Sequence, residues 1–197
     1  MGYVRKIKEM AKPNNFHPML VKAQMYLHQQ KACEFVLELF GLMPSEARSR
    51  GTALLMEMGI GKTIVSIAVA GCMYQRGKVK RVLVVAPLSI LSVWKEEFEK
   101  FADFPYSLTI LKGTSAKKKE QLTKLPDGGL QVVVVNYESA WRLEKELMAY
   151  NADLVIADEA HKLKENRTSQ SKGMHRIGDK ARYKLLLTGT VITNREL

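Results

Sequence analysis

The chain has 197 residues, of which 46% are hydrophobic and 26% are charged. These values are close to the globular average, so they exclude a disordered or collagen-like chain. At roughly 150 residues per domain, the length predicts one domain with a short appendage. We expect residues 19–197 to form the domain and residues 1–18, which are rich in proline and asparagine at their end, to form a flexible arm.

Lysine and arginine outnumber aspartate and glutamate by 31 to 20, which gives a net charge of +11. Such an excess favours polyanionic partners, and nucleic acid first. Most of it lies in residues 161–184, with eight basic and two acidic side chains, and in residues 112–124, with five and one. For the second segment, a solvated helix face is an equally good interpretation.

Two cysteines without C-x-x-C spacing indicate neither a zinc site nor a disulfide framework. The first residues, MGYVRKIKEMAK, lack the apolar stretch of a secretory signal. We therefore expect a cytoplasmic protein, or a nuclear or nucleoid-associated one if it acts on chromosomal DNA.

Along the chain, residues 21–40 predict an amphipathic helix, and short β-branched runs then alternate with segments of helical length. The predicted strands are residues 53–56, 82–86, 108–111, 132–135, 154–157 and 185–187. The predicted helices between them are residues 63–74, 89–101, 115–125 and 137–149. Several strands are apolar on consecutive positions, so both faces must be covered. The fold class is therefore α/β, with a mostly parallel central sheet flanked by helices.

Between the first strand and the following helix, the chain reads Gly-Ile-Gly-Lys-Thr. This is the context of a P-loop, in which backbone N–H groups and a helix N-terminus surround phosphate oxygens. The predicted nucleotide contacts are Met58, Gly59, Ile60, Gly61, Lys62 and Thr63. Lys62 would reach the terminal phosphates and the Thr63 hydroxyl would bind Mg²⁺. The full motif has a glycine where this chain has Met56.

Asp158 and Glu159 follow the strand at residues 154–157, at the sheet edge where open α/β folds bind ligands. We expect Asp158 to hold Mg²⁺, directly or through water, and Glu159 to orient and deprotonate the water that attacks the γ-phosphate. Two acids alone would also fit a capped helix start. With a P-loop earlier in the chain, they predict an ATP hydrolase with ATP and Mg²⁺ as ligands.

GIGKT and DEAH in this order resemble superfamily two helicases and translocases. Further segments narrow the resemblance to the Swi/Snf-type ATPases. These are APLS followed by VWKEEF within residues 86–98, VVNYES at 134–139, DEAHKLK at 158–164 and LTGT at 187–190. The resemblance covers about residues 20–197 and implies the first RecA-like lobe of a two-lobed motor.

The resemblance also implies roles for individual residues. Gln29 matches the segment that reads adenine, with Gln24 as the alternative if the register differs. Pro87, Leu88 and Ser89, and then Asn136, Tyr137 and Glu138, match segments that contact nucleic-acid phosphates without reading bases. For these two segments, ordinary turn chemistry is an equally good interpretation.

Three further positions match a stretch that links the nucleotide site to the nucleic acid: Thr188, Gly189 and Thr190. His161 would lie between this stretch and the Mg²⁺ side, and Lys162 and Lys164 follow it toward the expected DNA track. Val191 replaces the proline that is usual in the family. The tryptophans Trp94 and Trp141 are interpreted first as packing residues.

In this family a second RecA-like lobe brings arginines to the γ-phosphate, and no segment of this chain matches that lobe. We therefore expect the isolated lobe to hydrolyse ATP slowly. The predicted partners are double-stranded DNA and the second lobe. Two alternatives stay open: a strand-separating helicase of the same superfamily, and a non-catalytic nucleic-acid-binding module with a relic nucleotide site.

Overall fold

The computed structural model describes residues 20–57, 59–163 and 169–189. The predicted arm at residues 1–18 lies outside these ranges, as do three of the predicted site residues, Met58, Lys164 and Thr190.

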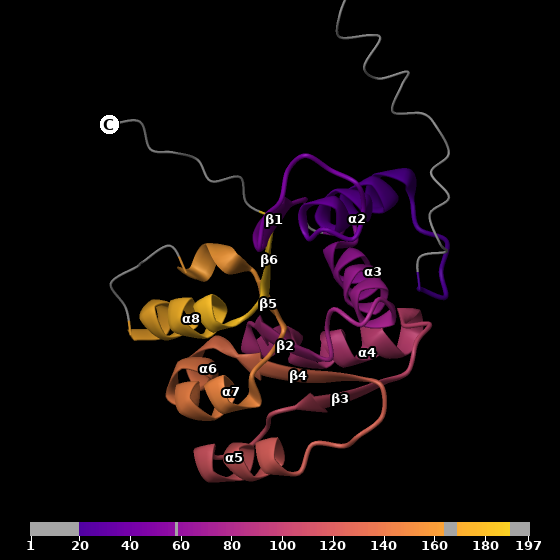
Figure 1. Cartoon of the computed structure of the whole chain (residues 1–197). Helices are drawn as coiled ribbons and strands as arrows, with labels where there is room; N and C mark the ends of the chain where they lie inside the picture. The colour runs from indigo at the N-terminus through magenta and orange to yellow at the C-terminus, as the bar shows by residue number, and fades with distance from the viewer. Residues whose placement is uncertain (1–19, 58, 164–168, 190–197) are drawn as a thin grey trace, which may run out of the picture.

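Six strands form one sheet in which every strand pair is parallel. The strands are β1 (Gly51–Leu55), β2 (Arg81–Ala86), β3 (Tyr106–Ile110), β4 (Leu130–Asn136), β5 (Leu154–Asp158) and β6 (Tyr183–Thr188). Their order in the sheet is β1-β6-β5-β2-β4-β3 (Figure 1). All six predicted strands are present, so the α/β class with a parallel central sheet is confirmed.

Helices connect the strands and cover both faces of the sheet (Figure 1). They are α2 (Leu27–Leu39), α3 (Lys62–Gln75), α4 (Leu91–Phe101), α5 (Ser115–Thr123), α6 (Tyr137–Arg142), α7 (Glu144–Tyr150) and α8 (Ser169–Lys180). Two short 3₁₀ turns, η1 (Leu88–Ile90) and η2 (Ala160–Leu163), follow β2 and β5.

The strand side chains divide into two buried clusters, because successive residues of a strand point to opposite faces. On one face, Val82 and Val84 of β2 belong to the cluster that contains α2, α3 and α4. On the other, Leu83 and Val85 belong to the cluster of α6, α7 and α8. The continuous apolar runs of the central strands β2, β4 and β5 are therefore explained, because helices cover these strands on both faces.

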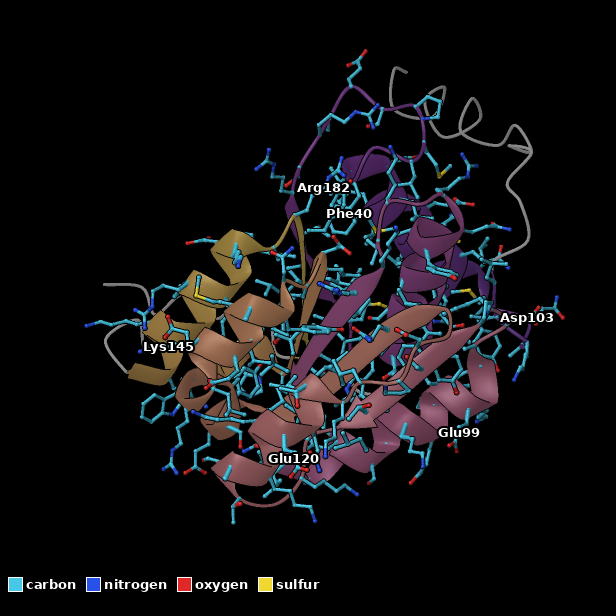
Figure 2. All side chains as sticks on the ribbon, turned by 60° about the horizontal axis from the view of Figure 1, so that its bottom comes forward. Phe40, Glu99, Asp103, Glu120, Lys145 and Arg182 are labelled. Atoms are coloured by element: carbon cyan, nitrogen blue, oxygen red, sulfur yellow. The ribbon has the colours of Figure 1, made fainter. Side chains whose placement is uncertain are left out.

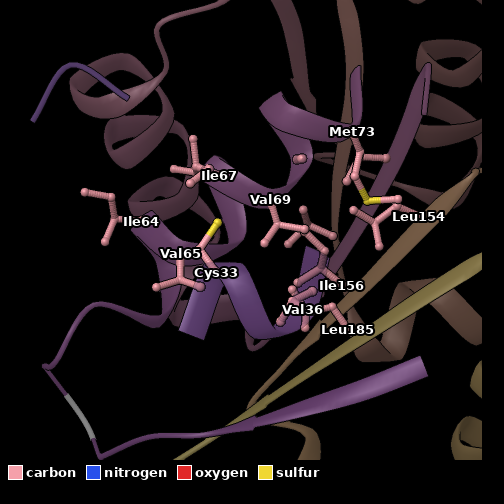
Figure 3. Packing of buried hydrophobic residues seen from close by; sticks show 14 of the residues in the cluster. Cys33, Val36, Ile64, Val65, Ile67, Val69, Met73, Leu154, Ile156 and Leu185 are labelled. Carbon is pink, nitrogen blue, oxygen red and sulfur yellow. The ribbon is translucent and has the colours of Figure 1, made fainter. Parts of the chain in front are cut away.

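Figure 3 shows the first of these clusters, where side chains of α3 face those of the central strands. Val69 and Met73 are fully buried there together with Leu154 and Ile156 of β5. This packing fixes the axis of α3 against the sheet. The N-terminus of α3, which begins at Lys62, is thereby held at the carboxyl edge of the strands.

The structure differs from the prediction in two helices. The segment at residues 137–149 is two helices, because the chain breaks at the fully buried Leu143. Helix α8 was not predicted, since its sequence carries two glycines and few apolar residues. Tertiary packing explains it: Met174 and Ile177 are buried, and at Gly173 an added Cβ would lie 2.9 Å from Trp141 Cβ.

The outer surfaces of the helices carry charged side chains, as Figure 2 shows for Glu99, Glu120 and Lys145. Within residues 20–57, 59–163 and 169–189, no helix combines the length and the apolar character needed to cross a membrane.

Candidate functional site

The site lies at the carboxyl edge of three neighbouring strands. Leu55 at the end of β1 pairs with Thr188 of β6, and Leu187 of β6 pairs with Asp158 at the end of β5. Since neighbouring strands lie about 4.8 Å apart, the ends of β1 and β5 are about 10 Å apart. The loop that follows β1 and the carboxylate that ends β5 therefore share one edge of the sheet.

The glycine loop has the backbone that its sequence requires. Gly59 and Gly61 have φ of 83° and 93°, in the left-handed region that favours glycine, and Gly61 is the N-cap of α3. Lys62 is 9% exposed, and its Nζ donates to the carbonyl oxygens of Met56 at 2.9 Å and Glu57 at 3.1 Å. The ammonium group therefore lies against the loop, and Thr63 follows it in the first turn of α3.

Gln29 joins helix α2 to this loop. Its Nε2 donates to the carbonyl oxygen of Ile60 at 3.0 Å, and its Oε1 accepts from the backbone N–H of Tyr26 at 3.0 Å. His28 Nε2 lies 3.2 Å from the same Ile60 oxygen. A primary amide has two N–H groups and two acceptor lone pairs, so one of each remains on Gln29. Gln29, rather than the alternative Gln24, therefore makes this hydrogen bond to the loop.

Asp158 is 6% exposed and is held by three hydrogen bonds. Trp94 Nε1 donates to Oδ2 at 3.0 Å, and the backbone N–H of Glu159 donates to Oδ1 at 2.9 Å. The Tyr137 hydroxyl donates to the Asp158 carbonyl oxygen at 2.6 Å. Both carboxylate oxygens and the backbone of this residue are therefore fixed by the protein.

Burial raises the pKa of the Asp158 carboxyl, and the charge of Glu159 adds to this effect. The Trp94 and Glu159 hydrogen bonds and the positive charge of Lys62 oppose the rise in pKa. The charges of Lys62 and Asp158 therefore lie close enough to interact across the site.

Glu159 has φ of 52°, a left-handed conformation that is costly for a residue with a side chain. Its Oε2 lies 3.1 Å from His161 Nδ1, without the angle of a hydrogen bond. The two side chains are 20% and 35% exposed, respectively. Backbone strain of this kind concentrates at functional sites, where the surrounding structure holds it.

The first segment predicted to contact nucleic acid follows β2. Leu88 is 72% exposed, Ser89 is exposed and Pro87 is half-buried. An exposed leucine on a short 3₁₀ turn has no packing role within the described residues, so this segment is free to meet a partner.

The second such segment follows β4 and is only partly accessible. Glu138 is exposed and Asn136 is half-buried, but Tyr137 is 4% exposed and uses its hydroxyl on Asp158. Contact of this segment with phosphates, through backbone amides and hydroxyls, stays a prediction, but the Tyr137 hydroxyl is already used on Asp158. The ring belongs to the second buried cluster, and only the backbone of this residue remains for a phosphate.

Several basic side chains of the two charged segments are paired within the protein. Lys119 and Lys124 contact Glu146 and Glu120, and Lys118 Nζ donates to the Ser139 hydroxyl. In the segment at residues 161–184, Arg176 binds Glu144 and Lys184 binds Asp179. The backbone of Lys162 is in η2, next to the site, and its side chain is outside the description.

The donor set fits a divalent cation that arrives with a nucleotide. No cluster of three or more histidine, cysteine, aspartate or glutamate side chains suited to a metal occurs among the described residues. Mg²⁺ is commonly bound by one or two carboxylates together with substrate phosphates rather than by an all-protein cage. One buried carboxylate, Asp158, beside a glycine loop and the Thr63 hydroxyl matches that arrangement.

A family model described as "SNF2-related domain" matches residues 25–197. The chain belongs to this family. Its SNF2-related relatives include the Arabidopsis thaliana protein CHROMATIN REMODELING 25, 29% identical over 189 residues, which cover 90% of this chain and 20% of that protein. The Mus musculus Chromodomain-helicase-DNA-binding protein 1-like is 36% identical over 154 residues, which cover 75% of this chain and 16% of that protein.

A solved structure, the Sulfolobus solfataricus SWI2/SNF2 ATPase core in complex with double-stranded DNA, superposes with a TM-score of 0.76. It is 26% identical, and the match covers 92% of this chain and 35% of that chain. The RecA-like fold of an SNF2-family motor lobe is thus confirmed. This SNF2-related chain spans about a fifth of the length of the curated relatives named above.

Sequence reasoning assigned Trp94 to packing and Tyr137 to phosphate contact, so it missed that both side chains hold Asp158. A weak signal was present. Trp has a single N–H donor, and burying it requires an acceptor. The sequence, however, does not show which acceptor lies within reach.

Proposed function

We propose that this chain is the ATP-binding motor lobe of a Swi/Snf-like translocase, which moves along double-stranded DNA when joined to a second RecA-like lobe. The observation that supports this most is the meeting of the Lys62 loop and Asp158 at one sheet edge, in a chain of the SNF2-related family. Each motif supplies what the other lacks: phosphate binding and a cation ligand.

In this proposal, the N–H groups at the start of α3 and the Lys62 ammonium bind the β- and γ-phosphates. Lys62 uses two of its three N–H donors on the Met56 and Glu57 carbonyl oxygens, so one donor remains for a phosphate. Thr63 and Asp158 would hold Mg²⁺, and when bound this ion would supply positive charge beside the phosphate oxygens. Glu159 would orient the attacking water and accept its proton, and His161 Nδ1 lies 3.1 Å from its Oε2.

In this proposal Gln29 reads adenine with its remaining N–H and lone pair, and its hydrogen bond to the Ile60 carbonyl oxygen of the loop supports this role. Thr188, between the ends of β1 and β5, and Gly189 after it provide the connection between the phosphate site and the nucleic-acid side. We include Thr190, His161, Lys162 and Lys164 in this role from the family resemblance.

Double-stranded DNA would lie along the exposed residues Leu88, Ser89 and Glu138 and the half-buried Pro87 and Asn136. Contacts to the phosphate backbone would be independent of base sequence and would weaken steeply with salt. The Sulfolobus core that this chain resembles was solved with double-stranded DNA, which favours a duplex translocase over a strand-separating helicase.

Catalysis in this proposal needs the second lobe. An arginine from outside the lobe contributes about a thousandfold or more in phosphoryl transfer. The 197-residue chain should therefore bind ATP much better than it hydrolyses it, and added duplex should not stimulate it strongly.

The test is a titration of a fluorescent ATP analogue, with and without Mg²⁺, on the wild type, Lys62→Ala and Lys78→Ala. Lys78 is an exposed lysine beyond the far end of α3, so its variant removes the same charge away from the site. We expect Lys62→Ala to weaken binding about tenfold or more, the value of a hydrogen bond to a charged group, and Lys78→Ala to bind as the wild type does. Equal binding by all three proteins would instead support a relic nucleotide site.

A further inference from the structure

Two aromatic side chains converge on Asp158 from opposite faces of the sheet. Trp94 of α4 belongs to the buried cluster on one face, and Tyr137 of α6 belongs to the cluster on the other. They contact different atoms of the same residue: Trp94 the carboxylate oxygen Oδ2, and Tyr137 the backbone carbonyl oxygen. Both hydrogen bonds end on Asp158, and neither involves the loop that would hold the phosphates.

The Trp94 contact fixes the carboxylate itself. The indole is 1% exposed, and its N–H has a single hydrogen to donate, which it gives to Oδ2 at 3.0 Å. Because the Glu159 N–H occupies Oδ1, the plane of the carboxylate is set by two donors. Each carboxylate oxygen keeps a free lone pair, so the two donors orient the Asp158 carboxylate and leave it able to bind a cation.

The Tyr137 contact fixes the backbone from which that carboxylate extends. The hydroxyl is a donor to the Asp158 carbonyl oxygen at 2.6 Å. The bond is made at the residue just before the strained turn at Glu159.

Each aromatic residue also lies in the first turn of a helix that follows a segment expected to contact DNA. Trp94 is in the first turn of α4, which begins at Leu91, two residues after the exposed segment at residues 87–89. Tyr137 is the first residue of α6, directly after Asn136. Strand β2, which leads to the first segment, pairs with both β5 and β4. One hydrogen bond therefore links the element that follows each segment to Asp158.

We propose that Trp94 and Tyr137 are positioning residues that orient Asp158 for Mg²⁺ and connect the two DNA-facing segments, residues 87–89 and 136–138, to Mg²⁺–nucleotide binding. The inference rests on the proposed function and specifies how that site is regulated. Outer partners of a metal ligand typically change metal affinity by about 10- to 100-fold when removed.

The test compares Trp94→Phe and Tyr137→Phe, each of which keeps the ring and loses the donor. Matched controls are Trp141→Phe, at a half-buried tryptophan of α6, and Tyr150→Phe. The Tyr150 hydroxyl is buried as well, but it donates to the carbonyl oxygens of Val82 and Gln131, at the opposite edge of the sheet. The readout is the Mg²⁺ concentration at half-maximal binding of a fluorescent ATP analogue, together with analogue binding in excess chelator.

We expect Trp94→Phe to raise the half-maximal Mg²⁺ concentration about tenfold and Tyr137→Phe to raise it about fivefold, as for loss of a single neutral hydrogen bond. Binding of the analogue in chelator should be unchanged in both. The two controls should match the wild type in both measurements. A role in packing alone would lower the thermal midpoint but leave the Mg²⁺ requirement unchanged, and that result overturns the inference.

A second measurement keeps the native Trp94. The chain has two tryptophans, so Trp141→Phe leaves Trp94 as the only one. In this variant we expect Mg²⁺ with ATP to change the Trp94 emission, and duplex DNA to shift the half-maximal Mg²⁺ concentration. Suppose that this variant binds the analogue, but Mg²⁺ with ATP does not change its Trp94 emission and duplex DNA does not shift its half-maximal Mg²⁺ concentration. That result overturns the inference and leaves the proposed function intact. A wild type that never binds the analogue overturns both.

Discussion

Gly61 and Gln29 are in direct contact: a Cβ added to Gly61 would lie 2.3 Å from Gln29 Nε2. Gln29 is 6% exposed and is bonded on both sides of its amide, so it has little freedom to move away. The contact ties α2 to the nucleotide loop, and it requires glycine at position 61 for two reasons, space and a φ of 93°.

We therefore expect Gly61→Ala to lower the free energy of unfolding by about 1–2 kcal/mol and to weaken binding of the ATP analogue about tenfold. The control is Gly77→Ala, at a φ of 65° with no atom within 4 Å of the added Cβ. It should lose stability from φ alone and bind normally. Denaturant unfolding and the analogue titration give both quantities. Normal binding by Gly61→Ala would contradict the role assigned to the contact.

Glu159→Gly should make the fold more stable while removing the proposed base. Glycine adopts a φ of 52° without the cost of a Cβ, so we expect a gain of about 1 kcal/mol. Asn151→Gly is the matched control, since Asn151 has a φ of 54° but belongs to a residue type that tolerates it. Its gain should be smaller. Unfolding experiments compare the two, and a loss of stability in Glu159→Gly would mean that the turn is not strained.

The stability of the α7–α8 contact should depend on pH. Hydrogen bonds from Arg176 lower the pKa of Glu144. A carboxyl with a lowered folded pKa stabilises the protein above its ordinary value and loses that contribution as the pH falls through the folded value. Glu144→Gln should therefore lower the thermal midpoint slightly at neutral pH, because the Arg176 side chain is 55% exposed and solvent screens the pair.

The difference between Glu144→Gln and the wild type should shrink as the pH falls below about 4.3, the ordinary value for glutamate. Glu138→Gln, which breaks an exposed i, i+4 pair with Arg142, gives a comparison within a single helix. Thermal melts over a pH series make the measurement. A difference that stays constant down to the lowest pH would show that the Arg176 contact does not stabilise the fold.

Ser89→Glu should weaken duplex DNA binding without affecting the fold. The residue is exposed at the carboxyl edge of the sheet, and a new negative charge within contact distance of a phosphate costs about 1 kcal/mol, or about fivefold in affinity. Gln75→Glu adds the same charge at the C-terminal end of α3, away from the carboxyl edge of the sheet, and should bind DNA as the wild type does. Anisotropy titrations with a labelled duplex at two salt concentrations decide this, and equal binding by both variants would move the DNA track elsewhere.

Much of the site was predictable because its residue types have local requirements. A glycine loop between a strand and a helix, with Lys62 and Thr63 after it, needs only neighbouring residues to be recognised. Asp158 and Glu159 were found in the same way, at the end of an apolar strand. The parallel order of the strands then places these two segments at one edge, as the structure has them.

Other features depended on distant residues and were not accessible from the sequence. Helix α8 has too few apolar positions to be predicted, and its packing against Trp141 through Gly173 explains it. The same holds for Tyr137, whose interpretation as a phosphate contact did not anticipate that its ring is buried.

The sequence by itself determined the α/β class, the six strands and the residues with phosphate and cation chemistry, because these depend on periodicity and on short motifs. Only the tertiary structure decided which side chains meet Asp158. Trp94 and Tyr137 are 64 and 21 residues away along the chain, and the sheet order places them beside it. A hydrogen bond depends on positions to within a fraction of an ångström, and such positions are set by the packing of the whole domain.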